Sequence, residues 1–410
     1  MTVNTIFIII LIILISDFIL ERMLSVLNIK ASKQPIPSLL SGIYDNEKYQ
    51  KQQAYFQANS RFGLITSTFS FIILMLMISL SGFGWLDGIV QGITEKPILV
   101  SLLFFGILFF ANDLISIPFE IYDTFVIEER FGFNKTTPKT FILDKLKGYL
   151  LTILLGGGLL SLIMWIYQLN PEYFWLIAWV VMSVFGLFMN MFYSELIVPL
   201  FNKQTPLEEG ELRDAIEKFS AKANFSIKNI YVIDGSKRST KANAYFTGFG
   251  KKKRIVLYDT LINQLTVDEI VAVLAHEVGH NKKKHTLKNM LISLIYNLLL
   301  FFLLGLFLKS DVLAQALGGV EANFHLNLLA FGILYSPISM VLGLLMNVLS
   351  RKHEYEADFF VKTNDFGAEL ISALKKISGQ ALSNLTPHPA VVFLSYSHPT
   401  LLQRVERLVE

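Results

Sequence analysis

The sequence predicts an α-helical polytopic membrane protein, in which seven transmembrane helices carry a polar domain that contains a small β-sheet. Three observations predict this class: 53% of the 410 residues are hydrophobic, only 17% are charged, and the apolar residues gather in seven runs. A soluble domain is typically about 25% charged. Each run is close to the roughly 20 residues that cross a bilayer as a helix. We therefore expect lipid to surround most of the chain.

The expected membrane helices fall into two groups, with five before the longest polar segment and two after it. They cover residues 4–20, 62–85, 98–117, 148–169, 173–194, 287–308 and 326–349. No Lys or Arg precedes the first run, unlike the start of a cleavable signal peptide, so we expect it to remain as an anchor. The chain then divides into helices one to five with their loops, a polar segment, helices six and seven, and a polar tail, at residues 1–198, 199–286, 287–349 and 350–410.

Lys and Arg alternate between the two sides of the membrane. Of the 36 such residues, 33 lie in the first, third and fifth connections and in the tail, and two lie in the connections between them. Because cytoplasmic loops are enriched in Lys and Arg, we expect the N-terminus outside and the C-terminus inside. Both polar segments are then cytoplasmic and able to form one domain. The cysteine-free, lysine-rich composition favours a bacterial inner membrane over the endoplasmic reticulum.

The first polar segment alternates between helical and extended patterns. We expect a helix and then three short strands, at 207–223, 230–233, 243–247 and 254–258. A further helix begins at Thr266, where T-V-D-E supplies a capping box with Thr266 as N-cap and Glu269 at the third helical position. Val271, Leu274 and Val278 make much of this helix apolar, so we expect it to be buried.

That helix contains His276-Glu277-Val278-Gly279-His280, an H-E-x-x-H sequence. Its two imidazoles lie one turn apart on one face, where their nitrogens can share a zinc ion. The chain has no cysteine, so His, Asp or Glu must supply every ligand. Glu277 is placed to accept a proton from the attacking water. The alternative is a pair of solvated histidines beside the membrane.

A catalytic zinc usually has three protein ligands, so one is missing from this motif. Some zinc proteases supply it as a histidine six residues after the second, but Thr286 stands there and His285 is out of step. The tail offers an acidic residue instead, because Glu354 and Asp358 are one helical turn apart where helix seven ends. Glu354 is the expected ligand, and Asp358 would accept an N–H from a ligand imidazole.

Other titratable residues have no expected part in this site. His353 and Glu356 point elsewhere on their helix and are expected to be solvated. We interpret His388 as a loop residue, and the charge pattern puts His325 across the membrane from the site. Acidic residues within or beside apolar runs should face an aqueous interior or lie at helix ends. These are Asp17, Asp113 and Glu195, for which a functional role and simple placement at a helix end both stay open.

Over most of its length the chain resembles the integral-membrane zinc-dependent CAAX prenyl proteases, also known as the a-factor-converting enzyme type. The motifs that carry this resemblance are Pro118-Phe119 through TFVIEERFGFNK (124–135), DGSKRSTKANAYFTGF (234–249) with KRIVLYDTLI (253–262), AHEVGH (275–280), and EYEAD (354–358) followed by TPHPAVVFLSYSHPTLLQR (386–404). The resemblance implies seven helices around a large hydrated chamber, capped by a gluzincin-type zinc metalloprotease domain.

Carried over residue by residue, the resemblance also implies the roles of the site. One zinc per chain would be held by three ligands, with a catalytic glutamate and a supporting aspartate: His276, His280, Glu354, Glu277 and Asp358. Asn243 and Ala244 would line the cleft, and Arg404 would lie near the substrate. His398 would help the reaction as a donor to the developing oxyanion. A lone histidine before proline is otherwise structural.

The small and aromatic residues that alternate between Ala242 and Thr247 suit a sheet edge that pairs with an extended peptide, although an ordinary strand has the same pattern. We expect a membrane-embedded zinc endopeptidase that cleaves near the membrane interface. The relevant resemblance is to the protease that removes the last three residues of prenylated CAAX proteins, and a prenyl group is one candidate modification of the peptide or protein substrate.

Two alternatives stay open: a quality-control protease that needs no lipid on its substrate, and a seven-helix transporter or receptor with structural zinc. The basic runs 251–254 and 282–284 are also typical of nucleic-acid binding. Attraction to anionic headgroups and the orientation rule already account for them, so we expect membrane lipids and no nucleic acid as partners.

Overall fold

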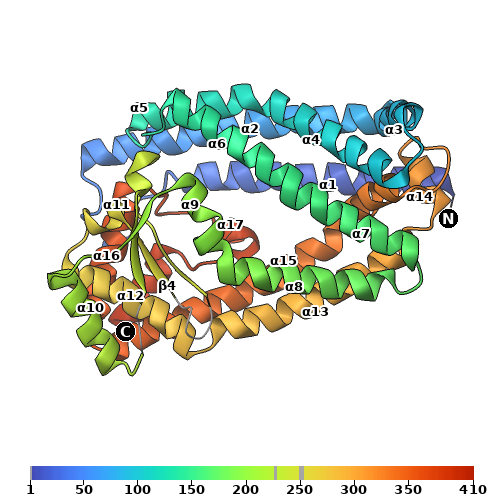
Figure 1. The fold of residues 1–410 in the computed structure, drawn as a ribbon. Coiled ribbons are helices and arrows are strands. Elements are labelled where there is room, and N and C mark those ends of the chain that lie inside the picture. Colours follow the sequence, from blue (N-terminus) through green and yellow to red (C-terminus); the bar gives the residue numbers. More distant parts are fainter. Residues whose placement is uncertain (1, 226–228, 249–253) are drawn as a thin grey trace.

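The computed structural model describes residues 2–225, 229–248 and 254–410. Long helices run side by side along the molecule, and the sheet lies with several short helices at one end (Figure 1). The N-terminus lies at the end of the bundle away from the sheet, and the C-terminus lies beside the sheet (Figure 1). The fold is thus a helical bundle with a compact α/β domain at one end.

Within the described ranges, seven helical segments are long and apolar enough to cross a membrane, which confirms the predicted number. They are Val3–Ala31, Asn46–Ser79, Pro97–Phe131, Pro138–Leu169, Phe174–Phe201, His285–Phe307 and Phe324–Thr363. At 1.5 Å per residue, the 40-residue last segment is about 60 Å long, twice the hydrocarbon thickness of about 30 Å. The last segment therefore continues beyond the membrane.

Two of the segments contain a short π-helical stretch, η2 and η3. The elements of the seven segments are α1 (Val3–Ala31), α2 (Asn46–Ser79), α4 (Pro97–Tyr122), η2 (Asp123–Glu128), α5 (Glu129–Phe131), α6 (Pro138–Leu151), η3 (Thr152–Gly157), α7 (Gly158–Leu169), α8 (Phe174–Leu196), α9 (Val198–Phe201), α13 (His285–Phe307) and α15 (Phe324–Thr363). The other helices are η1 (Ser38–Leu40), α3 (Gly82–Ile93), α10 (Glu211–Lys222), η4 (Gly235–Lys237), α11 (Asp259–Ile262), α12 (Val267–Lys282), α14 (Asp311–Ala316), α16 (Gly367–Gln380), α17 (Pro389–Ser395) and α18 (Leu401–Val409).

The second membrane helix ends earlier than its hydropathy predicted. The apolar run continued to residue 85, but α2 ends at Ser79 and the chain turns at Ser81, whose φ is +54°. The apolar residues that follow belong to α3, which packs against the end of α14. A Cβ on Gly84 would lie 1.9 Å from the carbonyl oxygen of Gly318, so this approach requires glycine. Hydropathy alone does not show such a turn.

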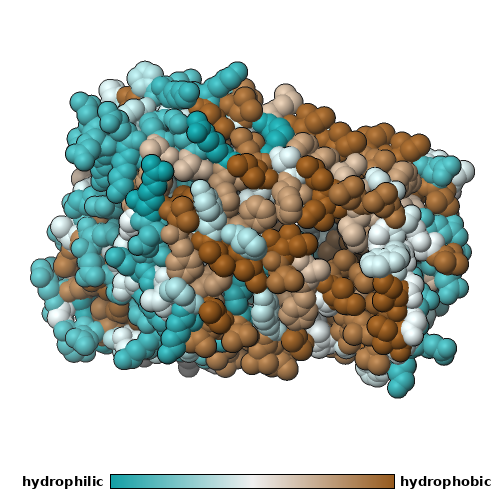
Figure 2. Space-filling view, turned by 90° about the horizontal axis from the view of Figure 1, so that it is seen from above, coloured by the Kyte–Doolittle hydropathy of each residue, from teal (hydrophilic) through white to brown (hydrophobic). Residues whose placement is uncertain are grey.

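The surface of the bundle is apolar where lipid would contact it. Figure 2 shows hydrophobic side chains over the long helices and a hydrophilic surface over the end that carries the sheet. Exposed large side chains such as Ile72 on α2, Leu114 on α4 and Ile295 on α13 contribute to it. Apolar patches of this extent mark contact with another apolar phase, and seven spanning helices make that phase a bilayer.

The sheet has four strands in the order β1-β2-β4-β3. Its strands are β1 (Gln204–Pro206), β2 (Ile230–Ile233), β3 (Ala244–Thr247) and β4 (Arg254–Tyr258). β2 and β4 are parallel, and the two outer pairs are antiparallel. The three predicted strands are confirmed, whereas the three-residue β1 carried no sequence signal and displaces the start of the following helix to Glu211. β3 is an edge strand within the described part of the sheet.

Helix α12 is the centre of the domain's hydrophobic core. The predicted capping box is present, because Thr266 accepts from the N–H of Glu269 and the Glu269 carboxylate accepts from the N–H of Thr266. Ile270, Leu274 and Val278 are buried between the sheet and the C-terminal helices. The expected buried helix is therefore confirmed, and its position is fixed by packing on several sides.

Candidate metal centre

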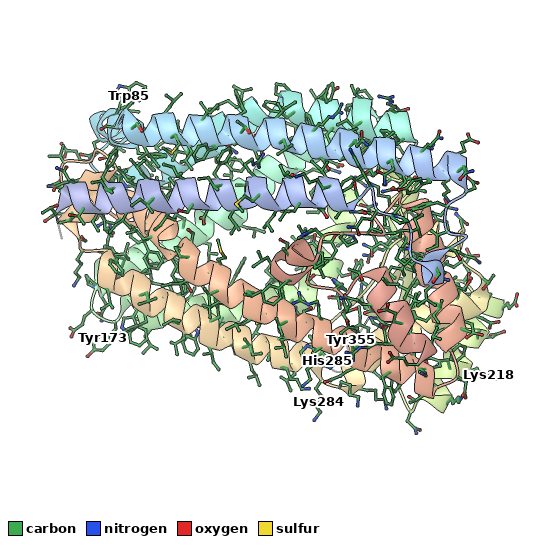
Figure 3. The ribbon with its side chains drawn as sticks, turned by 180° about the vertical axis from the view of Figure 1, so that it is seen from behind. Trp85, Tyr173, Lys218, Lys284, His285 and Tyr355 are labelled. Atoms are coloured by element: carbon green, nitrogen blue, oxygen red, sulfur yellow. The ribbon has the colours of Figure 1, made fainter. Side chains whose placement is uncertain are left out.

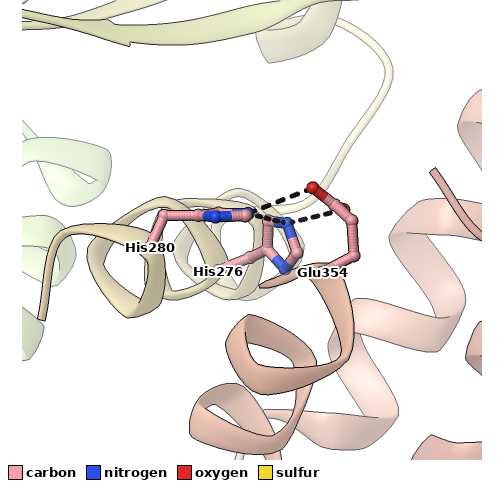
Figure 4. A group of neighbouring side chains, drawn as sticks. All are labelled: His276, His280 and Glu354. Carbon is pink, nitrogen blue, oxygen red and sulfur yellow. Dashed lines mark hydrogen bonds and ion pairs between the residues drawn. The ribbon is translucent and has the colours of Figure 1, made fainter. Parts of the chain in front are cut away.

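Two helices that are distant in sequence bring three possible metal ligands together. His276 and His280 lie one turn apart on α12, and Glu354 projects from α15 (Figure 4). One ligand atom from each residue lies within 4.8 Å of the others. The Nε2 atoms of the two histidines are 3.1 Å apart, and each is 3.2–3.3 Å from a Glu354 oxygen. The expected set of three residues therefore converges on one point.

A close crossing of the two helices makes this convergence possible. A Cβ on Gly279 would lie 3.1 Å from the Cα of Ala357 and 3.2 Å from its carbonyl oxygen. Even alanine at position 279 would push α12 away from α15. Ala357 itself is fully buried, and it sits between Glu354 and Asp358. The small residues of the two motifs thus set the separation of the side chains that flank them.

His276 is held from behind by a carboxylate. Its Nδ1 lies 2.9 Å from Oδ1 of Asp358, and Asp358 is in turn bound by the guanidinium of Arg404 at 2.6 and 2.8 Å. A carboxylate can only accept, so we assign the proton of this hydrogen bond to Nδ1. The Nε2 lone pair then points at Glu354. This is the usual arrangement of a metal-binding histidine and its supporting carboxylate.

The electrostatics of His276 follow from these neighbours. Burial lowers the pKa of His276 and the charge of Arg404 lowers it further, but the carboxylates of Asp358 and Glu354 outweigh both and raise this pKa to about 9. Burial also lowers the pKa of Arg404, while Asp358, Glu354 and Glu277 raise it above its ordinary value. The centre therefore favours positive charge, whether from a proton or from a metal ion.

The donor set fits a zinc ion. With its Nδ1 proton donated to Asp358, the neutral form of His276, which is the form that binds a metal, turns the Nε2 lone pair toward Nε2 of His280 and toward Glu354. Oε2 of Glu354 is buried and accepts no hydrogen bond from the described residues. Lone pairs this close repel one another unless a proton or a metal ion lies between them. Two imidazoles and a carboxylate, with one position left open, suit catalytic zinc.

Two further residues approach this centre. Glu277 follows His276 on α12 and is partly buried, and its charge acts on Arg404. His398, in the turn before α18, places its Nε2 3.4 Å from Oε1 of Glu354, and its side chain is 65% exposed. His398 also lines a cavity of about 630 Å³ between the N-terminal half of α2 and residues 378–401. The open side of the metal centre thus adjoins a space large enough for a short peptide.

Comparison with known proteins identifies the family. A model of CAAX prenyl protease N-terminal, five membrane helices, matches residues 25–203, and a model of peptidase family M48 matches residues 206–410. The chain belongs to peptidase family M48. As an M48 member it is a membrane-embedded metallopeptidase that acts on peptide or protein substrates, in a family that depends on zinc in general.

Full-length relatives support the same assignment. The CAAX prenyl protease 1 homolog of Oryza sativa subsp. japonica is 36% identical over 403 residues, covering 95% of this chain and 94% of the relative. CAAX prenyl protease 1 of Saccharomyces cerevisiae is 32% identical over 406 residues, covering 92% and 89%. The crystal structure of S. mikatae Ste24p matches with a TM-score of 0.93 and 31% identity, covering 99% of both chains. These findings confirm that the chain is an M48 metalloprotease, and they exclude the alternative of a transporter or receptor.

In this M48 chain, Asn243 and Ala244 lie at the edge of the sheet. Ala244 begins β3, and the exposed Asn243 precedes it and caps its N–H at 2.8 Å. No hydrogen bond or ion pair among the described residues joins either one to the histidine–glutamate group. Their contact with substrate, like that of Arg404, stays a prediction.

The structure corrects the assignment of two residues near the site. His353 and Glu356 were expected to be solvated, but His353 is 3% exposed and stacks on the His285 ring. Glu356 is 32% exposed, and its Oε2 lies 2.9 Å from Nε2 of His285. The chain turns at Lys284, with φ +58°, before α13 begins, and this turn places the His285 ring next to the His280 ring. That turn breaks the helical periodicity, so the spacing gave no signal for these residues.

The remaining titratable residues lie elsewhere in this peptidase. His388 caps α17 by accepting from the N–H of Ala390, which agrees with a loop residue. His325 is buried at the start of α15, with its Nε2 2.7 Å from Oδ1 of Asp87 on α3. The three acidic residues of the apolar runs have partners from other elements: Asp17 with Ser336, Asp113 with Lys145 and Glu195 with Arg254. Of the basic runs, residues 251–253 lie outside the described residues, and Lys282 binds the carbonyl oxygen of Asn224.

Proposed function

We propose that this M48 peptidase is a zinc endopeptidase that removes the C-terminal residues of prenylated proteins at the cytoplasmic membrane interface. The observation that carries the proposal is the position of the His276, His280 and Glu354 group. His280 lies only five residues before α13, and Glu354 lies on the extension of the membrane helix α15. A peptide that carries a lipid group would reach such a centre while its lipid group stays in apolar surroundings.

The three convergent residues are the proposed zinc ligands, one ion per chain. Zinc in this position would polarise the scissile carbonyl and lower the pKa of a bound water. Glu277 is the proposed general base, which takes the proton of the attacking water and passes it to the leaving nitrogen. His398, on the open side of the group, would donate to the carbonyl oxygen as negative charge develops on it. Asp358 would hold His276 in the ligating tautomer, with Arg404 behind it.

The substrate would lie along β3. An edge strand offers unpaired backbone groups to an extended peptide, and Asn243 and Ala244 begin that edge. The names of the relatives, which are CAAX prenyl proteases, favour a prenylated C-terminus as the substrate. The apolar surface of the adjoining bundle supports the same choice, because an isoprenoid partitions into apolar surroundings at about 0.8 kcal/mol per buried CH₂.

The proposed orientation puts the N-terminus outside and the metal centre in the cytoplasm. It rests on the distribution of Lys and Arg, which are concentrated in the connections at the end that carries the sheet. Anionic headgroups would then contact the basic residues around α12, and no nucleic acid is expected as a partner. The composition favours a bacterial inner membrane.

A pair of peptides tests the substrate. The purified protein is incubated with a farnesylated peptide that ends in a CAAX sequence and with the same peptide left unmodified, and the products are weighed by mass spectrometry. We expect the farnesylated peptide to lose its last three residues several-fold faster, and Glu277→Gln to leave both uncut. Equal cleavage of both peptides would replace prenyl processing with general membrane proteolysis. If neither peptide is cleaved, both prenyl processing and general membrane proteolysis are contradicted.

A further inference from the structure

His285 connects the metal centre to a residue at the surface. It is the first residue of α13 and is 2% exposed. Figure 3 shows it at the end of α13 that lies beside α15. Its Nδ1 is 3.0 Å from Nδ1 of His280, and its Nε2 is 2.9 Å from Oε2 of Glu356. The His353 ring stacks on the other side, with centroids 3.9 Å apart and planes 11° from parallel.

The chemistry of these groups fixes the direction of each hydrogen bond. The Glu356 carboxylate can only accept, so Nε2 of His285 carries a proton and donates it. Neutral His285 then has a lone pair on Nδ1 and accepts from Nδ1–H of His280. His280 is left with a lone pair on Nε2, the atom that lies 3.2 Å from Glu354. One carboxylate therefore sets the tautomers of two imidazoles in series.

The two histidines of the centre are supported in different ways. His276 donates directly to Asp358, whereas His280 donates to an imidazole that a carboxylate orients from behind. Asp358 is 1% exposed and bound by Arg404. Glu356 lies partly in solvent, and within the described ranges Lys288 and Lys352 act on it only from a distance, without an ion pair. The carboxylate that supports His280 is thus more exposed than the one that supports His276.

We propose that His285 is a positioning residue for His280, which fixes the ring orientation and the tautomer that a zinc ligand needs, and that Glu356 orients His285 for this task. The inference rests on the zinc site of the proposed function and adds two residues to it. A hydrogen bond to the second nitrogen of a ligand imidazole is typically worth 10- to 100-fold in metal affinity.

A purely structural role makes a different prediction. If His285 and Glu356 only tie α13 to α15, their loss would lower the stability of the metal-free fold. The affinity of the protein that remains folded would not change. The two roles therefore separate in a measurement of zinc affinity on folded protein, together with the thermal stability of the metal-free form.

The experiment compares His285→Asn with His285→Leu in the full-length protein in detergent. The Oδ1 of asparagine takes about the place of Nδ1 and accepts the His280 proton, whereas leucine fills the space without an acceptor. Zinc affinity is measured by competition with a chromophoric chelator. We expect His285→Leu to bind zinc roughly 10- to 100-fold more weakly and His285→Asn to stay within a few-fold of the wild type. Equal losses in both variants, or wild-type affinity in His285→Leu, would overturn the proposal.

Matched variants guard against loss of the fold. His353→Phe keeps a stacked ring on His285 and should leave zinc affinity unchanged. Glu356→Ala, at a partly exposed position, should weaken zinc binding by less than His285→Leu, and Glu356→Gln should restore it because its amide oxygen still accepts. Wild-type affinity in Glu356→Ala would contradict the role of Glu356. If the wild type itself binds no zinc in this assay, the proposed function fails, and if only the His285 series shows no effect, this inference alone fails.

Discussion

Arg404 binds Asp358 through two parallel contacts, with Nε 2.8 Å from Oδ2 and Nη2 2.6 Å from Oδ1. The pair joins α18 to α15 directly behind His276. Both side chains are buried, Arg404 at 11% and Asp358 at 2% side-chain exposure. Removing one partner of a buried ion pair is strongly destabilising, because the other charge stays buried without compensation. The C-terminal helix is therefore coupled to the metal centre by an ion pair.

This pair gives the first prediction. Asp358→Ala should weaken zinc binding by roughly 10- to 100-fold, because His276 loses its acceptor. It should also lower stability by up to about 3–5 kcal/mol, because buried Arg404 loses its two-contact partner and keeps only the longer ion pair with Glu354, at 3.7 Å. The double variant Asp358→Leu with Arg404→Leu should regain much of the stability but not the affinity. Chelator competition and thermal unfolding measure the two effects separately. If the double variant recovers both, Asp358 serves the fold and not the metal.

The second prediction concerns the ligands themselves. The purified protein should hold about one zinc per chain, and alanine at His276, His280 or Glu354 should release it and abolish cleavage, since each supplies one of three ligands. Glu356→Gln is the control and should keep the full metal content. Metal content is measured by elemental analysis. Full retention of zinc in Glu354→Ala would move the third ligand to Glu356 or Asp358.

Zinc binding should also release protons, which is the third prediction. The pKa of His276 is raised from 6.5 to about 9 in the metal-free fold. A raised pKa means that the bound proton stabilises this fold fully below pH 6.5, and that the gain disappears as the pH rises through about 9. Zinc must displace that proton, so apparent affinity should rise with pH over this window.

Calorimetry in two buffers of different ionisation enthalpy counts these protons. We expect about one proton released per zinc near pH 7.5 and fewer toward pH 10. In Asp358→Ala, where a carboxylate that raises this pKa is gone, the release at pH 7.5 should fall. A release that does not change with pH would show that His276 is unprotonated in the metal-free protein.

The fourth prediction tests orientation. Gln168 and Lys218 are both exposed, and the charge distribution puts the first outside and the second in the cytoplasm. The chain has no cysteine, so single cysteines at these positions have no background. An impermeant thiol reagent added to intact cells should label Gln168→Cys and not Lys218→Cys. Permeabilised cells, in which both should react, are the control, and labelling of Lys218→Cys from outside would reverse the orientation.

The sequence predicted what local rules determine. Seven apolar runs, the capping box at Thr266 and the spacing of His276 and His280 each need only neighbouring residues, and all three are present in the structure. Glu354 was reached by counting ligands and by the resemblance to a known family. His285 and Glu356 were missed because their contact depends on the left-handed turn at Lys284 and on the crossing of α12 with α15 at Gly279. Neither feature has a period that a sequence scan can detect.

The last prediction isolates the general base. Glutamine is nearly isosteric with glutamate and Glu277 is not a proposed ligand, so Glu277→Gln should keep its zinc and its fold. Glutamine does not accept a proton at neutral pH, so activity should fall by at least the roughly 10²- to 10⁴-fold that a positioned base contributes. Metal content, thermal unfolding and cleavage rate are measured on the same preparation.

Peptide binding by Glu277→Gln distinguishes loss of the general base from loss of the substrate site. Glu277→Gln should still capture a peptide with a lipid-modified C-terminus and release it uncut, because the edge strand β3, which is proposed to pair with the peptide, is unchanged. Near-normal turnover, or loss of zinc together with activity, would show that Glu277 is not the base. An inactive variant that binds plain and lipidated peptide equally would leave the catalytic assignment standing. In that case the lipid is not recognised, and the substrate preference must come from the peptide alone.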